Sequence, residues 1–180
     1  MPSLEFNLSP RDLILVSSIV IAFSTWILSA RSTLLHKRNQ HTINTMLHAN
    51  FSDSFGHARS AVAVVMKSAE IPDDFLDKEI YSTQRDSVRV ILNHYEFVCA
   101  GMRLGNFDER TIINCEKYSI IRYYEFFKPY IKVLREQRGR RNIYEHLEWT
   151  HARWCTPKFN IFIWAWEKLT ARPYFGKRNG

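Results

Sequence analysis

An uncharged stretch of eighteen residues, 13–30, lies close to the N-terminus of the chain. As a helix rising about 1.5 Å per residue it spans roughly 27 Å, close to the hydrocarbon thickness of a bilayer. A buried core helix is the alternative, but a core helix of this length usually carries some charge. A cleaved signal peptide fits less well, because Glu5, Arg11 and Asp12 form no basic cluster and no small-x-small site precedes Arg31. We therefore predict a retained transmembrane helix over residues 13–30.

The flanking charges predict the orientation of this helix. Arg11 alone precedes the span, whereas Arg31, Lys37 and Arg38 follow it within eight residues. Basic flanks remain on the cytoplasmic side of a membrane. We expect a single-pass protein with a short non-cytoplasmic N-terminus, residues 1–12, and with the bulk of the chain in the cytoplasm.

The span carries a row of small hydroxyl residues at offsets of seven, eleven and fourteen, which places them on one helical face: Ser18, Thr25, Ser29 and Ser32. Small polar residues let transmembrane helices approach closely and form hydrogen bonds with one another. This face predicts a homo-oligomer in the lipid bilayer, and in a ring the same face could line a pore. Alternatively, each hydroxyl donates to a backbone carbonyl one turn back.

Composition limits the chemistry of the remaining chain. The net charge is +7 and the pI about 9.5, which suits nucleic acid or an anionic membrane surface without choosing between them. Cys99, Cys115 and Cys155 are an odd number at wide spacings, so we expect reduced thiols, no disulfide framework and no cysteine pair that holds a metal. His94 and Glu96 diverge on a helix and make no metal site by themselves. No phosphate-binding glycine loop is present, and we predict neither a metal nor a cofactor.

Apolar residues recur at helical spacing as far as about residue 154. No stretch shows the sustained alternation of apolar and polar residues that is typical of a strand. We expect a helical stalk over 31–55 and a domain over 56–180, so the class is all-α: a membrane helix followed by a helical bundle. The candidate helices of the bundle cover about 56–70, 74–103, 108–135 and 142–154.

Three local signals define ends or irregularities of these helices. Gly105 with Asn106 ends the second helix, and Asp108 is placed to cap the third. Pro129 is expected to kink the third helix or to reset it before Ile131.

An aromatic segment, 159–169, follows the last helix. We expect it either to close the core of the bundle or to lie against lipid headgroups, where tryptophan is enriched. Arg172, Lys177 and Arg178 fit contact with anionic lipid in the second case.

The sequence RGRRNIYEHLEW, 138–149, contains the strongest candidate for a catalytic or ligand-binding site. Arg141 can grip a phosphate, and His146 can donate or accept a proton near neutral pH. Together they suffice for metal-free RNA cleavage, in which the 2′-hydroxyl attacks its own phosphate. Asn142, Arg138 and Arg140 are candidate ligand-binding residues beside this pair, where the basic run is either a solvated turn or a contact for lipid or RNA.

The run Arg141-Asn142-Ile143-Tyr144-Glu145-His146 resembles the Arg-Asn-x-x-x-His signature of the HEPN superfamily of helical nucleases and nucleotide-binding proteins. The resemblance implies a HEPN-like bundle. It also implies that two copies of the motif meet across a dimer interface to build one RNA-cleaving site.

The whole architecture resembles a second family, the small membrane accessory proteins of type VI-B, RNA-targeting CRISPR systems. That resemblance implies an oligomeric pore in the bacterial inner membrane, which works with an RNA-guided RNase to strengthen antiphage defence. The central segment 94–112 is also similar to a family of bacterial membrane-anchored proteins of unassigned function.

Three functional hypotheses follow. The first is an oligomeric inner-membrane pore or membrane-perturbing accessory protein, in which Arg141 and His146 hold an interface or bind RNA. The second is a membrane-tethered, metal-independent HEPN ribonuclease that uses Arg141 and His146 as catalytic residues. The third is a non-catalytic membrane-anchored adaptor. We favour a protein that is not an enzyme, because a pore requires a membrane anchor and a nuclease gains little from one.

Overall fold

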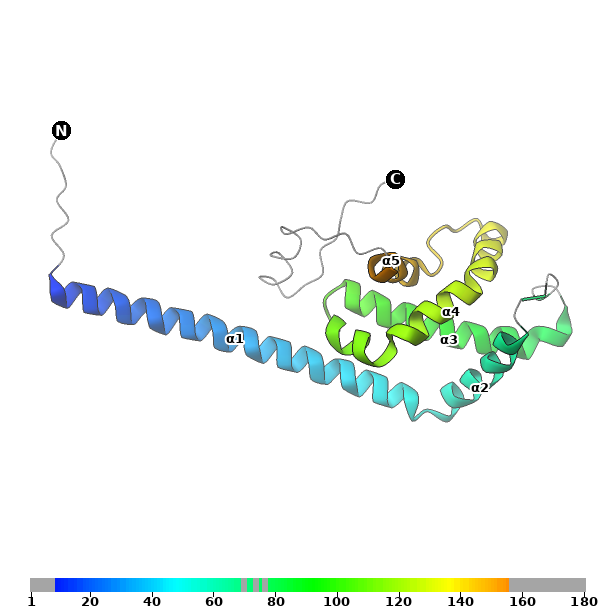
Figure 1. Ribbon diagram of the computed structural model, residues 1–180, viewed down its shortest axis with the longest axis horizontal. Helices are drawn as coiled ribbons and strands as arrows, with labels where there is room; N and C mark the ends of the chain where they lie inside the picture. The colour runs from blue at the N-terminus through cyan, green and yellow to red at the C-terminus, as the bar shows by residue number, and fades with distance from the viewer. Residues whose placement is uncertain (1–8, 69–70, 73–74, 76–77, 156–180) are drawn as a thin grey trace, which may run out of the picture. The chain divides into compact units, whose positions relative to one another are not determined.

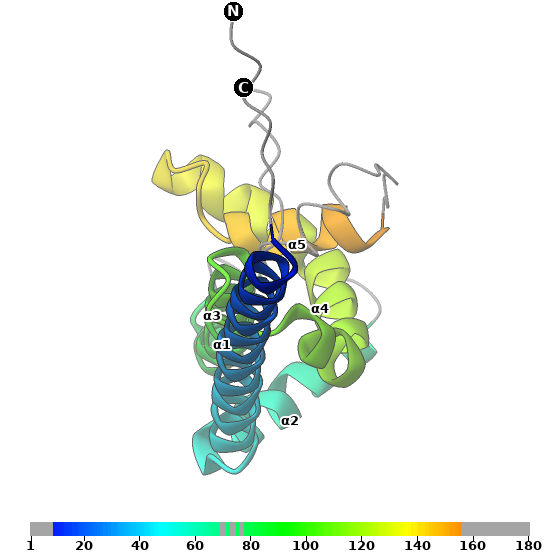
Figure 2. The same cartoon turned by 90° about the vertical axis from the view of Figure 1, so that its left-hand side faces the viewer.

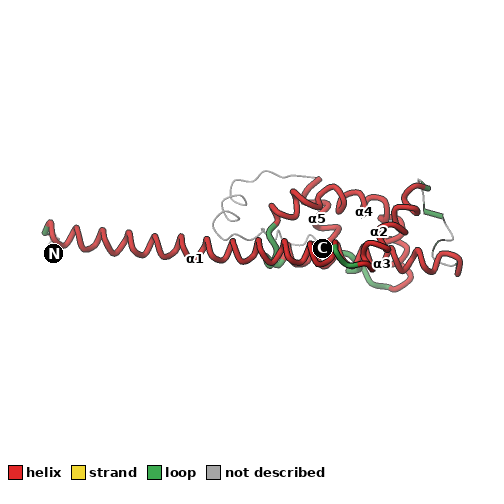
Figure 3. Tube along the Cα trace, turned by 90° about the horizontal axis from the view of Figure 1, so that it is seen from below, coloured by secondary structure: helices red, strands yellow, loops and turns green. Residues whose placement is uncertain are grey.

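The computed structural model describes residues 9–68, 71–72, 75 and 78–155. This part of the chain contains five α-helices and one 3-10 turn, and no strand is found among its residues (Figure 1 and Figure 3). The elements are α1 (Pro10–Asn50), α2 (Asp53–Lys67), η1 (Glu79–Tyr81), α3 (Ser82–Arg103), α4 (Glu109–Arg138) and α5 (Glu145–Cys155). The predicted all-α class is confirmed. The chain divides into two compact units, residues 1–37 and residues 38–180.

The described part of the first unit, residues 9–37, contains the apolar part of α1. Its 18-residue window has a mean hydropathy of 2.2, and none of that window is buried. It is the one helix of the described residues that is long and apolar enough to cross a membrane. A helix of this kind near the N-terminus fits a membrane anchor or a signal sequence.

The last turns of α1 belong to the second unit. Thr42 is 1% exposed and Met46 is 7% exposed, and both pack into the bundle. The boundary between the two units, after residue 37, therefore falls inside the predicted stalk, 31–55. α1 ends at Asn50 and α2 begins at Asp53, three residues before the start that we expected for this helix.

The core of the second unit is formed by the apolar faces that the periodicity predicts. α2 packs on α3, and α5 packs on both α3 and α4 (Figure 2). The completely buried side chains come from all four of these helices and include Val62, Val88, Ile91, Leu92, Met102, Ile112, Ile120, Phe127 and Leu147.

The start of α3 differs from the prediction. We expected a helix from residue 74, but η1 precedes α3, which begins at Ser82. The guanidinium of Arg85 donates to the carbonyl oxygens of Phe75 (2.9 Å) and Lys78 (2.6 Å). These two carbonyls thereby gain a side-chain donor outside the regular helix.

The turn between α3 and α4 follows the predicted signals. α3 ends at Arg103, Gly105 has a φ of 76°, and Asp108 caps α4 by accepting a hydrogen bond from Thr111 N at 2.8 Å. Gly101 lies in the last turn of α3, where a Cβ atom would sit 2.4 Å from the ring of Phe107. Glycine is therefore required there for close packing, not for backbone freedom.

α4 continues through Pro129 as one helix and ends at Gly139, which has a left-handed φ of 59°. The expected reset at Pro129 does not occur. Proline removes one backbone donor, and Pro129 is exposed, so water can satisfy the carbonyl that loses its partner.

The three cysteines are free, as expected, but they differ in environment. Cys115 and Cys155 are exposed, whereas Cys99 is buried in the core. Burial raises the pKa of the Cys99 thiol to about 12. The aromatic segment 159–169 and the basic residues Arg172, Lys177 and Arg178 lie outside the described residues.

Candidate functional site

The predicted motif lies at the junction between α4 and α5. We expected the last helix to begin at Asn142, but residues 141–144 form a turn and α5 begins at Glu145. Tyr144 has a left-handed φ of 56° while its side chain is buried. This backbone conformation cannot continue a right-handed helix, so Arg141 and Asn142 lie in the turn and His146 lies in the first turn of α5.

His146 is held by polar side chains from α3 and α5. Arg103 Nη1 lies 3.2 Å from His146 Nδ1, and because a guanidinium only donates, this bond uses the Nδ1 lone pair. Glu145 Oε1 lies 3.8 Å from both His146 Nε2 and Arg103 Nη1. In this arrangement Nδ1 is occupied and does not serve as a base.

Glu96 of α3 caps the N-terminus of α5. Its carboxylate accepts hydrogen bonds from the backbone N–H groups of His146 (3.1 Å) and Leu147 (2.8 Å). An anion at a helix N-terminus satisfies unpaired amides and is favoured by the helix dipole. Burial raises the pKa of Glu96 more than these two hydrogen bonds lower it.

The other predicted residues lie at the surface. Arg138, at the end of α4, and Arg140, Arg141 and Asn142, in the turn, are all exposed. No hydrogen bond or ion pair joins the side chain of Arg141 to another residue of the described part. Within one chain, the structure thus brings His146 into a polar cluster and leaves Arg141 facing solvent.

A pocket of about 320 Å³ lies beside this turn, and its lining residues are Arg89, Asn93, Glu96, Leu134, Arg138, Ile143 and Tyr144. Two guanidinium groups and one amide can bind a phosphate or another oxyanion, although Glu96 lines the same pocket and Arg89 also pairs with Asp86 at 3.2 Å. Burial raises the pKa of Tyr144 to about 12, so its phenol is neutral at physiological pH.

Of the lining residues, only Arg138 was predicted to bind a ligand. Arg89, Asn93 and Glu96 recur at helical spacing on α3, a signal that is visible in the sequence. These three residues line a pocket only because the turn at 141–144 folds over them, and the sequence does not predict that turn.

Two hydroxyl groups of the predicted oligomer face form hydrogen bonds with the backbone of α1 itself. Ser18 Oγ donates to Leu15 O and Thr25 Oγ1 donates to Ile21 O, both at 2.8 Å. For these two residues the structure has the backbone bonding that we considered as the alternative. Such bonding leaves the side chains small, so close packing of the face, which includes Ser29 and Ser32, stays a prediction.

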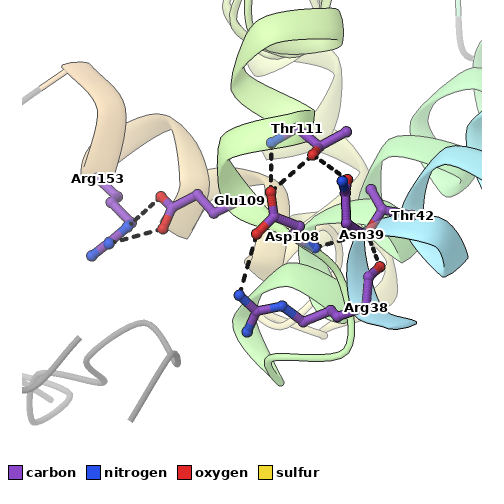
Figure 4. Close-up of polar contacts among 7 residues, drawn as sticks. All are labelled: Arg38, Asn39, Thr42, Asp108, Glu109, Thr111 and Arg153. Carbon is purple, nitrogen blue, oxygen red and sulfur yellow. Dashed lines mark hydrogen bonds and ion pairs between the residues drawn. The ribbon is translucent and has the colours of Figure 1, made fainter. Parts of the chain in front are cut away.

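A third group of polar residues joins α1, α4 and α5 within the second unit: Arg38, Asn39, Thr42, Asp108, Glu109, Thr111 and Arg153 (Figure 4). We call this group the junction. Arg38 Nη2 lies 3.2 Å from Asp108 Oδ1, and Asp108 N donates to Thr42 Oγ1 at 2.8 Å. The hydroxyl of Thr111 lies 2.7 Å from Asn39 Oδ1 and 2.8 Å from Asp108 Oδ2.

On the other side of the junction, α4 is tied to α5. Arg153 binds Glu109 through two hydrogen bonds of 2.7 and 3.0 Å, and Trp154 Nε1 donates to the same carboxylate at 3.0 Å. Burial alone would raise the pKa of Asp108, but hydrogen bonds from Thr111 and Arg38, with the charge of Arg38, lower it below its usual value. Both carboxylates that begin α4 therefore bind an arginine from another helix.

Comparison with known proteins gives one finding on identity. A family model described as "Domain of unknown function (DUF4760)" matches residues 13–154, which include the apolar part of α1 and the described bundle up to Trp154. No curated protein matches the chain, and no solved structure matches it. The resemblances to HEPN nucleases and to CRISPR accessory proteins therefore stay predictions. Because the match covers most of its length, the chain belongs to the DUF4760 family, a family of domains of unknown function.

Proposed function

We propose that the chain is a single-pass membrane protein that self-associates through α1 and forms a pore or a membrane-perturbing ring. The observation that carries this proposal is the segment 13–30, which is uncharged, helical and exposed along its length. An exposed apolar surface of this size is not compatible with water and calls for lipid or another copy of the helix. The hydroxyl face provides the small side chains that close helix contacts require.

The charges near the ends of the span support an orientation with the bundle in the cytoplasm. Arg31 and Lys37 follow the span, whereas Arg11 alone precedes it. In a bacterial cell the corresponding location is the inner membrane.

The surroundings of the motif support a role other than RNA cleavage. Cleavage requires a free base and a phosphate-binding cation at one phosphate. The Nδ1 atom of His146 is used by Arg103, and Arg141 faces solvent from the turn. On this proposal the motif shapes the start of α5, and its arginines contact an anionic partner or another subunit.

The first test is the mass of the assembly in mild detergent, by light scattering with the detergent contribution removed. We expect wild type to form a closed oligomer of about six or more subunits, because a ring of identical copies satisfies all of its own interfaces. The double variant Ser18→Leu/Thr25→Leu is expected to reduce the mass. Ser17→Leu/Ser24→Leu is the matched control, since these residues also bond their own backbone but lie about 100° away on the helix.

The outcomes separate the hypotheses. A monomeric wild type, or equal effects of the two double variants, contradicts the proposal and favours the membrane-anchored adaptor. A closed oligomer leads to dye-leakage measurements on vesicles that contain the protein, with the Ser18/Thr25 variant as the negative control.

The pocket beside the turn supports the membrane-tethered ribonuclease as a second candidate, because Arg89 and Arg138 line it and can bind phosphate. Metal-independent cleavage of RNA by wild type, lost in His146→Ala while the oligomer mass is kept, would establish it. A detergent-extracted dimer would agree with the paired motif.

Participation in RNA-targeting defence is the part of the proposal that rests on resemblance. Phage challenge of cells that express an RNA-guided RNase, with and without this protein, tests it. Equal protection in the two strains contradicts that role. The proposal of a membrane oligomer is then tested only by the mass of the assembly in detergent.

A further inference from the structure

Three potential metal ligands meet where the last two turns of α5 pack against the middle of α4. They are Glu125 of α4 and His151 and Cys155 of α5, each of which offers one ligand atom, and these atoms lie within 4.8 Å of one another. His151 Nε2 is already 3.0 Å from Glu125 Oε1. We propose that Glu125, His151 and Cys155 bind one zinc-class divalent cation.

The local structure explains how these side chains come together. His151 and Cys155 are four residues apart on α5, so they occupy the same helical face. Glu125 lies on the side of α4 that faces α5, next to Tyr124, whose ring contacts the His151 ring at 4.7 Å between centroids. The ring contact restricts the orientation of the imidazole, which is one condition for a defined site.

The donor set selects the class of cation. A thiolate, an imidazole and a carboxylate are the three ligand types that zinc accepts in proteins. Magnesium and calcium prefer oxygen ligands alone, and a sulfur–nitrogen pair disfavours both. With three protein ligands, the fourth position of a tetrahedral site is open to water or to a further donor.

The distances need only a small adjustment. With metal bonds of about 2.3 Å to sulfur and about 2.0–2.1 Å to nitrogen and oxygen, tetrahedral ligand atoms lie about 3.3–3.6 Å apart. The nitrogen and oxygen are therefore close to their final separation, and the sulfur has to approach them by at most about 1 Å. Cys155 is exposed at the end of α5, so rotation of its side chain can supply this movement.

Binding balances protons as follows. The Cys155 thiol releases its proton to solvent and binds as a thiolate, while His151 binds through Nε2 as a neutral imidazole that carries its one proton on Nδ1. The two anionic ligands then neutralise the divalent cation. The metal would cross-link α4 and α5 at a place separate from the Arg153–Glu109 contact.

This inference differs from our expectation that the chain holds no metal. That expectation rested on the wide spacing of the cysteines and on the divergence of His94 and Glu96. The simpler explanation is a hydrogen bond between His151 and Glu125 in which Cys155 takes no part. The two explanations make opposite predictions for Cys155.

Cobalt(II) is the probe, used with the full chain in detergent after removal of bound metal by a chelator. Coordination by a thiolate produces a near-ultraviolet charge-transfer band, and tetrahedral geometry produces intense visible bands. We expect wild type to show both at one cobalt per chain. Cys115→Ser, which removes the other exposed thiol, is the matched control and should keep both bands, whereas Cys155→Ser should lose the near-ultraviolet band.

A second measurement does not depend on the spectrum. Zinc should raise the thermal unfolding midpoint of wild type and of Cys115→Ser, and should leave the midpoint of Cys155→Ser unchanged, because a cation that binds only the folded state stabilises it. Circular dichroism establishes that each variant is folded. The proposal is overturned if wild type binds no cobalt, if the near-ultraviolet band survives in Cys155→Ser, or if it is lost in Cys115→Ser.

Discussion

Asp108 performs two separable tasks in the junction, and two substitutions distinguish them. Its carboxylate caps α4 by accepting from Thr111 N at 2.8 Å, and it pairs with Arg38 at 3.2 Å. Asn retains the capping oxygen but not the charge, whereas Ala removes both. We expect both variants to lower the free energy of unfolding, with Asp108→Ala lowering it further.

The size of each effect follows from the geometry. Loss of an N-cap side chain costs about 1 kcal/mol. The ion pair is partly buried, with side-chain exposures of 17% and 21%, so its loss costs about 1 kcal/mol, at the upper end of the range for exposed pairs. Asp108→Asn should therefore reduce the free energy of unfolding by about 1 kcal/mol, and Asp108→Ala by about 2 kcal/mol.

The same pair of variants makes a prediction about pH. The pKa of Asp108 is lowered in the folded state from its usual 3.8, so the carboxylate stabilises the fold fully above that value and loses its contribution as the pH falls through the lowered pKa. The difference between wild type and Asp108→Asn should be constant from about pH 5 to 8 and should narrow below about pH 4.

The assay is denaturant unfolding of the full chain in detergent, followed by the helical circular dichroism signal. Two results would refute the reasoning. Equal losses in the Asn and Ala variants would mean that the cap contributes nothing, and a difference from wild type that grows on acidification would mean that the sign of the pKa shift is wrong.

Two further predictions concern helix packing and the motif. Gly101→Ala should lower the free energy of unfolding by about 1–3 kcal/mol, because the new Cβ atom meets the Phe107 ring at 2.4 Å. Gly56→Ala is its control and should raise the free energy of unfolding by about 0.5–1 kcal/mol, since nothing lies within 4 Å of that position in α2. Glu96→Ala should cost about 1–3 kcal/mol and increase hydrogen exchange at His146 N and at the next amide, because both lose their acceptor. Unchanged exchange at these amides would contradict the assignment of Glu96 as the cap of α5.

Features that depend on neighbouring residues were the ones that the sequence predicted well. The cap at Asp108 and the end of α3 near Gly105 follow from local backbone chemistry, and the structure has both. The apolar faces of α3 and α4 likewise follow from helical periodicity. Of the kink or reset expected at Pro129, the reset does not occur, because α4 continues through this exposed proline.

Features that require knowledge of distant partners were missed. The start of α5 depends on Glu96, fifty residues before His146, and the late start of α3 depends on the contacts of Arg85. The three proposed metal ligands were missed for the same reason. His151 and Cys155 are near in sequence, but Glu125 lies twenty-six residues before His151. The predicted motif lies where α4 and α5 meet, and the turn at Tyr144 separates Arg141 from the helix that carries His146.

The reaction rate of the buried Cys99 thiol reports how often the folded bundle opens. Thiol reagents attack the thiolate, and a buried thiol with a pKa of about 12 presents almost none at neutral pH. In the folded, metal-free bundle, a labelling reagent should therefore modify Cys115 and Cys155 at once and reach Cys99 only when α3 separates from α5. The delay between the two phases measures how often the bundle opens, in detergent or in a membrane, without any introduced cysteine.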